Sequence, residues 1–450
     1  MSEKIIRDPV HDVIAFRTSS PGELLLFKLL GAAEFQRLRR IRQLGMAHLA
    51  YPGADHSRYG HSLGAMETAR RILDCLRRDH SIDGAGETAC LAAVLLHDLG
   101  HGPFSHVFES VSGIDHEQIT LQIIQDTDAE VHRLLAEHDP KLPGEVAALL
   151  KGVEEGERSA VKGSSDVSRA PPPRTFFHDI VSSQLDADRL DYLLRDNLMT
   201  GSRYGDYDLN WLLHALTIDH ASGRLAILWK GVSAVEAYLQ SRYHMYRNVY
   251  FHKVVRSAEA MVKLALQRAK RLAVQDRLSW PPREHVVFKA LLGQRLSTGE
   301  FTDLDDISLM HCFKVWSTGD DTALASLCRG LLYRKLFKTI DLTLLDDESA
   351  NAAVAAARAA IEAASGDARY DMIYDQPADT PYQTGFPSDT GELLVRAANG
   401  RLIPFATLSP LPAALNQQLM FRRIHVAEHW KQTAMEAAAP FLVQGGERVY

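Results

Sequence analysis

The feature that most constrains the fold of this chain is a histidine and an aspartate side by side at the end of an apolar segment. Residues 91–96 read Leu-Ala-Ala-Val-Leu-Leu, and His97 and Asp98 follow directly. We expect residues 87–97 to form a buried helix. An aspartate buried there is costly unless another group compensates its charge. A bound divalent cation would do so, and so would a hydrogen bond between His97 and Asp98 that caps the helix.

Two other segments offer further metal ligands. His61 stands in Arg58-Tyr59-Gly60-His61-Ser62, and Asp188 stands in Asp186-Ala187-Asp188-Arg189. Together with His97 and Asp98 they supply two imidazoles and two carboxylates from three separated segments. That ligand set suits one first-row divalent ion such as Fe, Mn, Co, Ni or Zn, with positions left for water and substrate. The spacing does not choose among these metals.

Composition narrows the class of protein. The chain has 450 residues and a formal net charge of -7, so it is not a basic nucleic-acid binder as a whole, although a local contact stays open. Its four cysteines form no C-x-x-C pair, which favours a reducing cytosol. The polar N-terminus does not resemble a secretory signal, and no apolar run is long enough to span a bilayer. We therefore expect a cytoplasmic protein that does not enter a membrane.

Hydrophobic periodicity predicts mainly helices. We expect a turn at residues 8–11, helices at 34–44, 61–78, 87–97, 116–125, 179–197, 232–270 and 350–364, and a strand near 401–405. Most arginines of the 34–44 helix are expected to be solvated. Residues 152–174 are polar and end in three prolines, which is typical of a surface loop or a flexible insert.

At these motifs the chain resembles the HD-domain phosphohydrolases, whose signature is H…HD…D. More closely, it resembles the HD core of the SAM-and-HD-domain deoxynucleoside triphosphate triphosphohydrolases and their bacterial homologues. The matching segments run in the family's order and include Gln36-Arg37-Leu38-Arg39, Gln43-Leu44-Gly45, Tyr51-Pro52-Gly53-Ala54, Arg58 to Gly64, His97 to His106, His116-Glu117-Gln118, Asp186 to Asp196 and Tyr250-Phe251-His252-Lys253. The resemblance implies a mainly α fold, with an HD helical core at 1–270 and a smaller α+β lobe at 271–450.

The resemblance also implies roles for individual residues. His61, His97, Asp98 and Asp188 would bind the metal, while His101, His106 and His116 would face the scissile phosphate with support from Glu109, where the family member compared has Asp. Substrate contacts would come from Gln43, Leu44, Arg58, Arg189, Tyr192, Asp196, Arg242, Tyr250 and Lys253. Without the resemblance, these tyrosines would be ordinary aromatics at the edge of the core, and Arg189 and Arg242 would be surface ion pairs.

The chemistry requires such residues on independent grounds. A nucleoside triphosphate carries about four negative charges, and an ion held by two carboxylates has little charge left. Arginines and lysines must therefore line the site. Asp188, Tyr192 and Asp196 are spaced by four residues, so one helix can present all three on one face.

The expected reaction is attack of water on the α-phosphorus, which yields a nucleoside and triphosphate, with additional Mg accompanying the substrate. A different HD-type nucleotidase or phosphodiesterase, or a nucleotide-sensing assembly module without activity, are the alternatives. In the resembled family a guanine nucleotide assembles a tetramer. Lys4 matches that site, but Arg7 and Gly31 stand where Asn and Asp are expected, and glycine cannot accept the guanine N–H groups. Activation by a guanine nucleotide is therefore no more expected than constitutive activity or a different activator, and we expect a homo-oligomer, a dimer or a tetramer.

Overall fold

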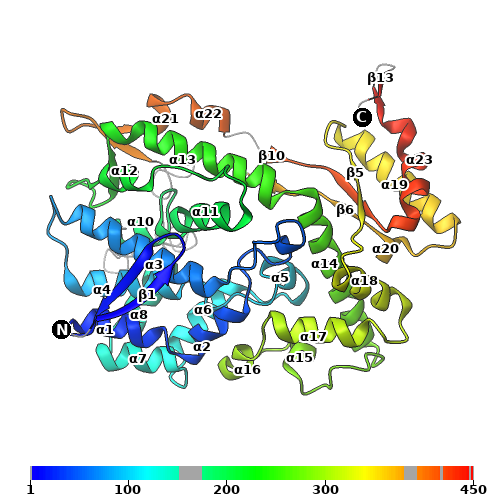
Figure 1. Cartoon of the computed structure of the whole chain (residues 1–450), viewed down its shortest axis with the longest axis horizontal. Helices are drawn as coiled ribbons and strands as arrows, with labels where there is room; N and C mark the ends of the chain where they lie inside the picture. Colours follow the sequence, from blue (N-terminus) through cyan, green and yellow to red (C-terminus); the bar gives the residue numbers. More distant parts are fainter. Residues whose placement is uncertain (1–2, 152–174, 380–392, 416–418, 445–446, 449–450) are drawn as a thin grey trace, which may run out of the picture.

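The computed structural model describes residues 3–151, 175–379, 393–415, 419–444 and 447–448. Within these ranges the chain is mainly helical, with short strands in small sheets. The predicted mainly α fold with a sheet-containing C-terminal part is therefore confirmed (Figure 1). The predicted insert at 152–174 lies outside the described residues.

Three helices form the centre of the larger part: α3 (Arg58–Leu76), α4 (Gly84–Leu96) and α11 (Ala187–Thr200). Helix α3 packs against both of the others. Every residue of α4 from Ala89 to Leu96 is buried, and the Asp83 side chain caps its first turn by accepting a hydrogen bond from the backbone N–H of Gly86. Apolar packing therefore fixes where α4 ends, directly before the His-Asp pair.

The remaining helices of the larger part surround this centre. They are α1 (Pro21–Leu29), α2 (Ala33–Arg37), α5 (His106–Ser112), α6 (His116–Gln125), α7 (Glu130–His138), α8 (Leu142–Lys151), α10 (Phe176–Val181), α12 (Leu209–His214), α13 (Val232–Met245) and α14 (Lys253–Val274). The predicted helix at 116–125 is confirmed, with Asp115 as its cap.

Two long helices predicted from the sequence are interrupted. The segment 179–197 is divided between α10 and α11, because Asp186 caps a new helix by accepting from the N–H of Arg189. The segment 232–270 contains a π-helical turn, Tyr246–Tyr250, after which the His252 side chain caps α14. Such π turns occur often at functional sites, and this one faces the cavity described below.

The prediction of a basic helix at 34–44 is also wrong in its second half. Only α2 and a short turn at Leu38–Arg40 are helical, and the backbone is extended at Ile41. Arg37, expected to be solvated, is 1% exposed. Its guanidinium donates to the carbonyls of Leu304, Leu99 and His101, so it joins three segments rather than meeting solvent.

An N-terminal hairpin lies across the helical core. Its antiparallel strands are β1 (Glu3–Asp8) and β2 (Asp12–Arg17), and the predicted turn at 8–11 joins them. The Asp8 carboxylate accepts the backbone N–H groups of Val10 and His11 within this turn. The hairpin tip is thereby held in one conformation.

Helices also follow α14: α15 (Val286–Leu291), α16 (Thr298–Thr302), α17 (Asp306–Trp316) and α18 (Thr322–Leu332). Their buried side chains belong to the same hydrophobic core as the N-terminal helices, and this core also takes in later residues such as Val395 and Phe405. The domain boundary after residue 270 stays a prediction.

A second core begins after residue 338. The antiparallel sheet β5 (Lys338–Asp341), β11 (Arg423–Val426) and β6 (Met372–Asp375) shares it with α19 (Asp347–Ala363) and α23 (Lys431–Ala438). A four-stranded sheet belongs to the larger part: β3 (Leu216–Ile218), β4 (Leu225–Leu228), β8 (Leu394–Arg396) and β9 (Leu402–Pro404). The remaining short α-helices and strands are α20 (Ala368–Asp371), α21 (Phe405–Leu408), α22 (Leu411–Leu415), β7 (Ala378–Asp379), β10 (Leu419–Met420), β12 (Val443–Gln444) and β13 (Glu447–Arg448).

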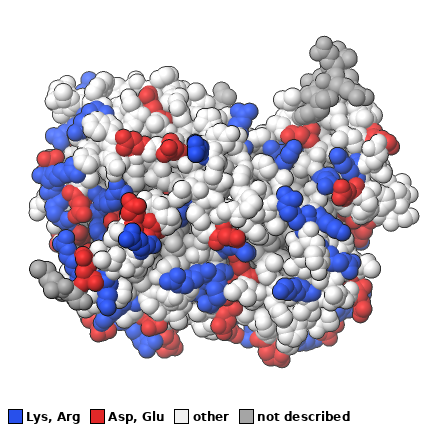
Figure 2. Space-filling view, viewed as in Figure 1, with Lys and Arg blue, Asp and Glu red and all other residues white. Residues whose placement is uncertain are grey.

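The surface carries both signs of charge, as expected for a chain with 50 basic and 57 acidic residues. Basic and acidic side chains are interspersed on the face shown in Figure 2. Among the described helices, none combines the length and the apolar composition that crossing a bilayer requires.

Candidate metal centre and active site

Three helix ends bring one cluster of metal-ligand groups together. His61 lies in the first turn of α3, His97 follows α4, and Asp188 lies in the first turn of α11. An oxygen of Asp188 lies 2.9 Å from Nε2 of His61 and 3.5 Å from Nε2 of His97. Ligand atoms bound at about 2.1 Å to one ion are about 3–4 Å apart. These three residues therefore form a possible metal site.

The two imidazoles are oriented as metal ligands require. Nδ1 of His61 donates to Asp191 at 2.9 Å, and Nδ1 of His97 donates to the Val94 carbonyl at 2.7 Å. Each ring thus presents a buried Nε2 to the cluster, where it faces the carboxylates of Asp188 and Asp98. A divalent cation fits this arrangement, since metal-bound histidines usually donate their other ring nitrogen to a carboxylate or a carbonyl.

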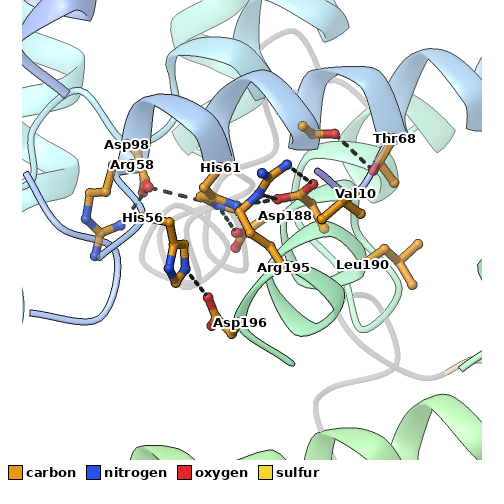
Figure 3. A network of polar contacts seen from close by, with 12 residues as sticks. Val10, His56, Arg58, His61, Thr68, Asp98, Asp188, Leu190, Arg195 and Asp196 are labelled. Atoms are coloured by element: carbon orange, nitrogen blue, oxygen red, sulfur yellow. Dashed lines mark hydrogen bonds and ion pairs between the residues drawn. The ribbon is translucent and has the colours of Figure 1, made fainter. Parts of the chain in front are cut away.

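Asp98, the fourth predicted ligand, borders the cluster. Its oxygens lie 3.4 Å from Nε2 of His97 and 3.9 Å from Nε2 of His61, within the spacing that a shared ion allows. Arg58 also pairs with Asp98 at 2.6 Å, and His101 approaches it at 3.2 Å. Burial alone would raise the pKa of Asp98, but the Arg58 guanidinium and the imidazoles hold it well below its usual range. The carboxylate is therefore ionised. Figure 3 shows Asp98 beside Arg58 and His61.

Protonation links this cluster to pH. Burial lowers the pKa of His61, but hydrogen bonds and charge from Asp188 and Asp191 outweigh that effect and raise it to about 10. The same imidazoles hold the pKa of Asp188 well below its usual range against its burial. A cation that binds here must displace the proton of His61, so metal binding and proton release are coupled.

A second cluster contains the residues predicted to face the phosphate. Glu109 accepts from Nδ1 of His116 at 3.1 Å and from Nδ1 of His106 at 3.2 Å. His101 stacks on His116 with ring centroids 4.1 Å apart. Burial and the charge of Arg58 hold the pKa of His101 well below its usual range, so this imidazole is neutral. Loss of water around the ring lowers the pKa of His106, even though 71% of its side chain is exposed. The hydrogen bond to Glu109 opposes that lowering.

Both clusters open into one cavity of about 1020 Å³. Its lining contains predicted metal, catalytic and substrate residues: Gln43, Leu44, Arg58, His97, Asp98, His101, His106, His116, Asp188, Arg189, Tyr192, Asp196 and Tyr250. Groups from α3, α11 and the π-helical turn thus share one space. Its volume exceeds what a metal ion and water need and allows for a nucleotide-sized ligand.

Two predicted phosphate contacts, Arg242 and Lys253, are not among the described residues that line this cavity. Arg242 is buried, and its guanidinium lies over the Tyr246 ring. Lys253 lines a second cavity of about 290 Å³, together with Arg334, Lys338 and Lys431. Their contact with substrate stays a prediction. Arg189 does line the large cavity, where it pairs with Asp186.

Three polar residues at the site were not identified from the sequence. His56 contacts Asp196, while His11 and Asp191 support His61 from behind. Asp191 follows Asp188 by three residues, so helical spacing could have indicated it. His11 and His56 have no such signal, because they act across 180 and 140 positions of the chain.

Comparison with known proteins agrees with this geometry. Residues 58–170 match the HD domain model, and residues 207–277 match the model of an HD-associated region. The uncharacterised protein YwfO of Bacillus subtilis is 38% identical over 349 residues, which cover 77% of this chain and 74% of that protein. The deoxynucleoside triphosphate triphosphohydrolase SAMHD1 homolog of Dictyostelium discoideum is 28% identical; the match covers 68% of this chain but only 57% of that protein.

A solved structure extends the likeness to the whole fold. The crystal structure of a phosphohydrolase from Bacteroides thetaiotaomicron matches with a TM-score of 0.77 and 27% identity, over 94% of this chain and 100% of that one. The resemblance predicted from the motifs is thereby confirmed. The chain belongs to the HD-domain phosphohydrolase family.

Proposed function

We propose that this protein is a metal-dependent deoxynucleoside triphosphate triphosphohydrolase. The observation that carries the proposal is one cavity of about 1020 Å³ in which the metal cluster, the three-histidine group and the carboxylate of Asp196 all meet. The SAMHD1 homolog of Dictyostelium discoideum, whose match covers 68% of this chain, is named as a deoxynucleoside triphosphate triphosphohydrolase. The donor set accepts a first-row divalent ion such as Fe, Mn, Co, Ni or Zn, held by His61, His97, Asp188 and Asp98, with Mg accompanying the triphosphate.

The bound metal would supply Lewis-acid polarisation of a phosphoryl oxygen. The remaining steps belong to side chains. Arg58 and Arg189 hold the triphosphate charge, and the histidine group lies beside the α-phosphorus. A water oxygen forms a new bond to that phosphorus, the bond from phosphorus to the nucleoside 5′-oxygen breaks, and His106 or His116 donates a proton to the leaving oxygen. The products are the nucleoside and triphosphate, and the water oxygen stays on triphosphate.

The sugar end of the cavity supports the deoxynucleoside assignment. Asp196 and Tyr192 lie on one face of α11, and Gln43 and Leu44 line the same space. A carboxylate accepts a hydrogen bond from a sugar hydroxyl, and bulk close to the ring excludes an additional hydroxyl.

Replacement of Asp188 by Ala tests this function. We expect it to abolish metal retention and triphosphate release, while Asp347→Ala, at an exposed ion pair of the smaller part, leaves both intact. A panel of deoxy- and ribonucleoside triphosphates, run in water labelled with heavy oxygen, identifies the products. Label in triphosphate is expected. Orthophosphate, an opened phosphodiester, or metal binding without turnover would instead indicate a nucleotidase, a phosphodiesterase or a sensor.

Assembly belongs to the same proposal. We expect a cytoplasmic homo-oligomer, a dimer or a tetramer, whose activity does not depend on GTP, since Gly31 offers no carboxylate to a guanine base. Light scattering and triphosphate release, each with and without GTP, test this expectation. A rise in both mass and activity with GTP would contradict it.

A further inference from the structure

The N-terminal hairpin reaches the back of the metal cluster. Its strands are largely exposed, and Ile5 of β1 is 58% exposed. Its tip is different, because Asp8 is buried and the His11 side chain is 1% exposed. The hairpin therefore carries two polar groups into the core, far from its own solvent-facing surface.

Both groups meet a network centred on Asp191 of α11. Figure 3 labels two of its members, His61 and Arg195, which lie side by side. One oxygen of Asp191 accepts from Nε2 of His11 at 2.8 Å and from Arg195 at 2.9 Å. The other oxygen accepts from Nδ1 of His61 at 2.9 Å and from Arg195 at 2.8 Å. Arg195 in turn donates to Asp8 at 2.9 Å. All of the donors and acceptors in this network are buried.

The network leaves Asp191 one orientation. Each carboxylate oxygen accepts two hydrogen bonds, and Arg195 already uses its donors on both oxygens and on Asp8. His11 supplies one of the four hydrogen bonds to Asp191, and the other three come from Arg195 and His61. Without His11, the oxygen that it holds accepts from Arg195 alone, so the carboxylate is positioned less firmly and the hydrogen bond that orients His61 weakens.

We propose that His11 is a positioning residue for the metal ligand His61, acting through Asp191, so that the hairpin tip is a structural part of the metal centre. This inference rests on the metal site of the proposed function. Outer groups that orient a metal-bound histidine typically change metal affinity by about 10–100-fold when removed.

Cobalt binding to the purified full chain tests the inference. Co²⁺ affinity is measured by competition with a chelator, and the visible absorption of bound Co²⁺ reports the geometry of its ligands. We expect His11→Leu to weaken Co²⁺ binding by about 10–100-fold and to alter the spectrum. His11→Gln keeps an N–H donor and is expected to recover most of the affinity.

The matched control is Arg70→Gln. Arg70 donates to the Ala15 carbonyl of β2 at 3.2 Å and also to the carboxylates of Glu67 and Glu23. None of these partners belongs to the Asp191 network, so Arg70 holds the hairpin from outside that network. We expect Arg70→Gln to bind Co²⁺ like the unmodified protein. The unfolding midpoint of each variant is measured in the presence of chelator, so that no metal contributes to it. A variant that has lost stability itself is thereby distinguished from one that has lost only metal affinity. If His11→Leu does not fold, His11→Asn, whose shorter side chain reaches Asp191 poorly, replaces it under the same criteria.

Two results would overturn the inference: unchanged affinity and spectrum in His11→Leu, or equal weakening in Arg70→Gln. Failure of the unmodified protein to bind Co²⁺ would overturn the inference together with the proposed function. Normal binding by the unmodified protein and by His11→Leu would remove the inference alone.

Discussion

Nε2 of His56 lies 2.7 Å from one oxygen of Asp196, and the Tyr250 hydroxyl donates to the other oxygen at 2.9 Å. His56 stands on the loop before α3, Asp196 on α11, and Tyr250 on the π-helical turn. The carboxylate that we assign to the sugar is thus held by two separate segments. The orientation of the Asp196 carboxylate therefore depends on how these segments pack together, and not on α11 alone.

Replacing His56 by Leu should raise KM for the preferred deoxynucleotide by about tenfold, since a hydrogen bond to a charged group is worth about 1.5 kcal/mol. The turnover number should change less, because His56 lies behind Asp196 and does not line the cavity. Steady-state kinetics with purified protein measure both values. His56→Gln keeps a donor and serves as the control. A loss confined to turnover would contradict this role.

Gly64→Ala should destabilise the protein, although alanine favours helices. Gly64 lies in α3, and a Cβ there would overlap the side-chain ends of Arg195 and Asp191. Those ends cannot move freely, because Asp8, His11 and His61 hold them. We expect a loss of about 1–3 kcal/mol in the free energy of unfolding, as for overpacking of a core, together with weaker metal retention.

Gly144→Ala is the matched control for this substitution. Gly144 lies in α8, and a Cβ there meets nothing within 4 Å. The substitution should therefore leave stability unchanged or raise it by about 0.5–1 kcal/mol. Urea unfolding compares both variants with the unmodified protein. Equal effects of the two would refute the steric explanation.

Glu109→Gln should shift the pH profile of the reaction. Glu109 opposes the lowering of the pKa of His106, so removal of its charge lowers that pKa further. If His106 acts as a protonated acid, the alkaline limb of the rate profile moves to lower pH. Glu109→Asp keeps the charge and should keep the limb in place, with a lower rate. An unmoved limb in Glu109→Gln would exclude His106 as the acid.

Asp306→Asn should change how stability depends on pH. The carboxylate accepts the N–H groups of Phe104 and Arg42, but burial dominates and raises the pKa of Asp306 from 3.8 to about 6. The folded protein therefore keeps a proton that the unfolded chain releases, so stability falls as pH rises from about 4 to about 6.

The variant lacks this titration. Between pH 4 and pH 7 the stability difference should thus shift in its favour by about 2 kcal/mol, on top of a constant offset for the lost acceptor. Urea unfolding of both proteins across this range measures the shift. A difference that does not vary with pH would contradict the raised pKa.

The sequence alone indicated the family and the residues that meet in the possible metal site. Helical periodicity identified α4 and its end, and the HD dipeptide, His61 and Asp188 indicated the cluster before any coordinates. The helix and the clustering of these side chains could be predicted because the signals are local: an apolar run, a helix end, and side chains spaced along one helix face.

Only the tertiary structure decided how those ligands are held. His11, His56 and Arg37 gain their partners from segments 180, 140 and 267 positions away, and no local pattern encodes such contacts. The interruption of the long helices at Asp186 and at the π-helical turn likewise follows from caps and packing around the cavity. The physical reason is that a charged side chain can be buried only where distant groups compensate it, and the complete fold alone brings those groups together.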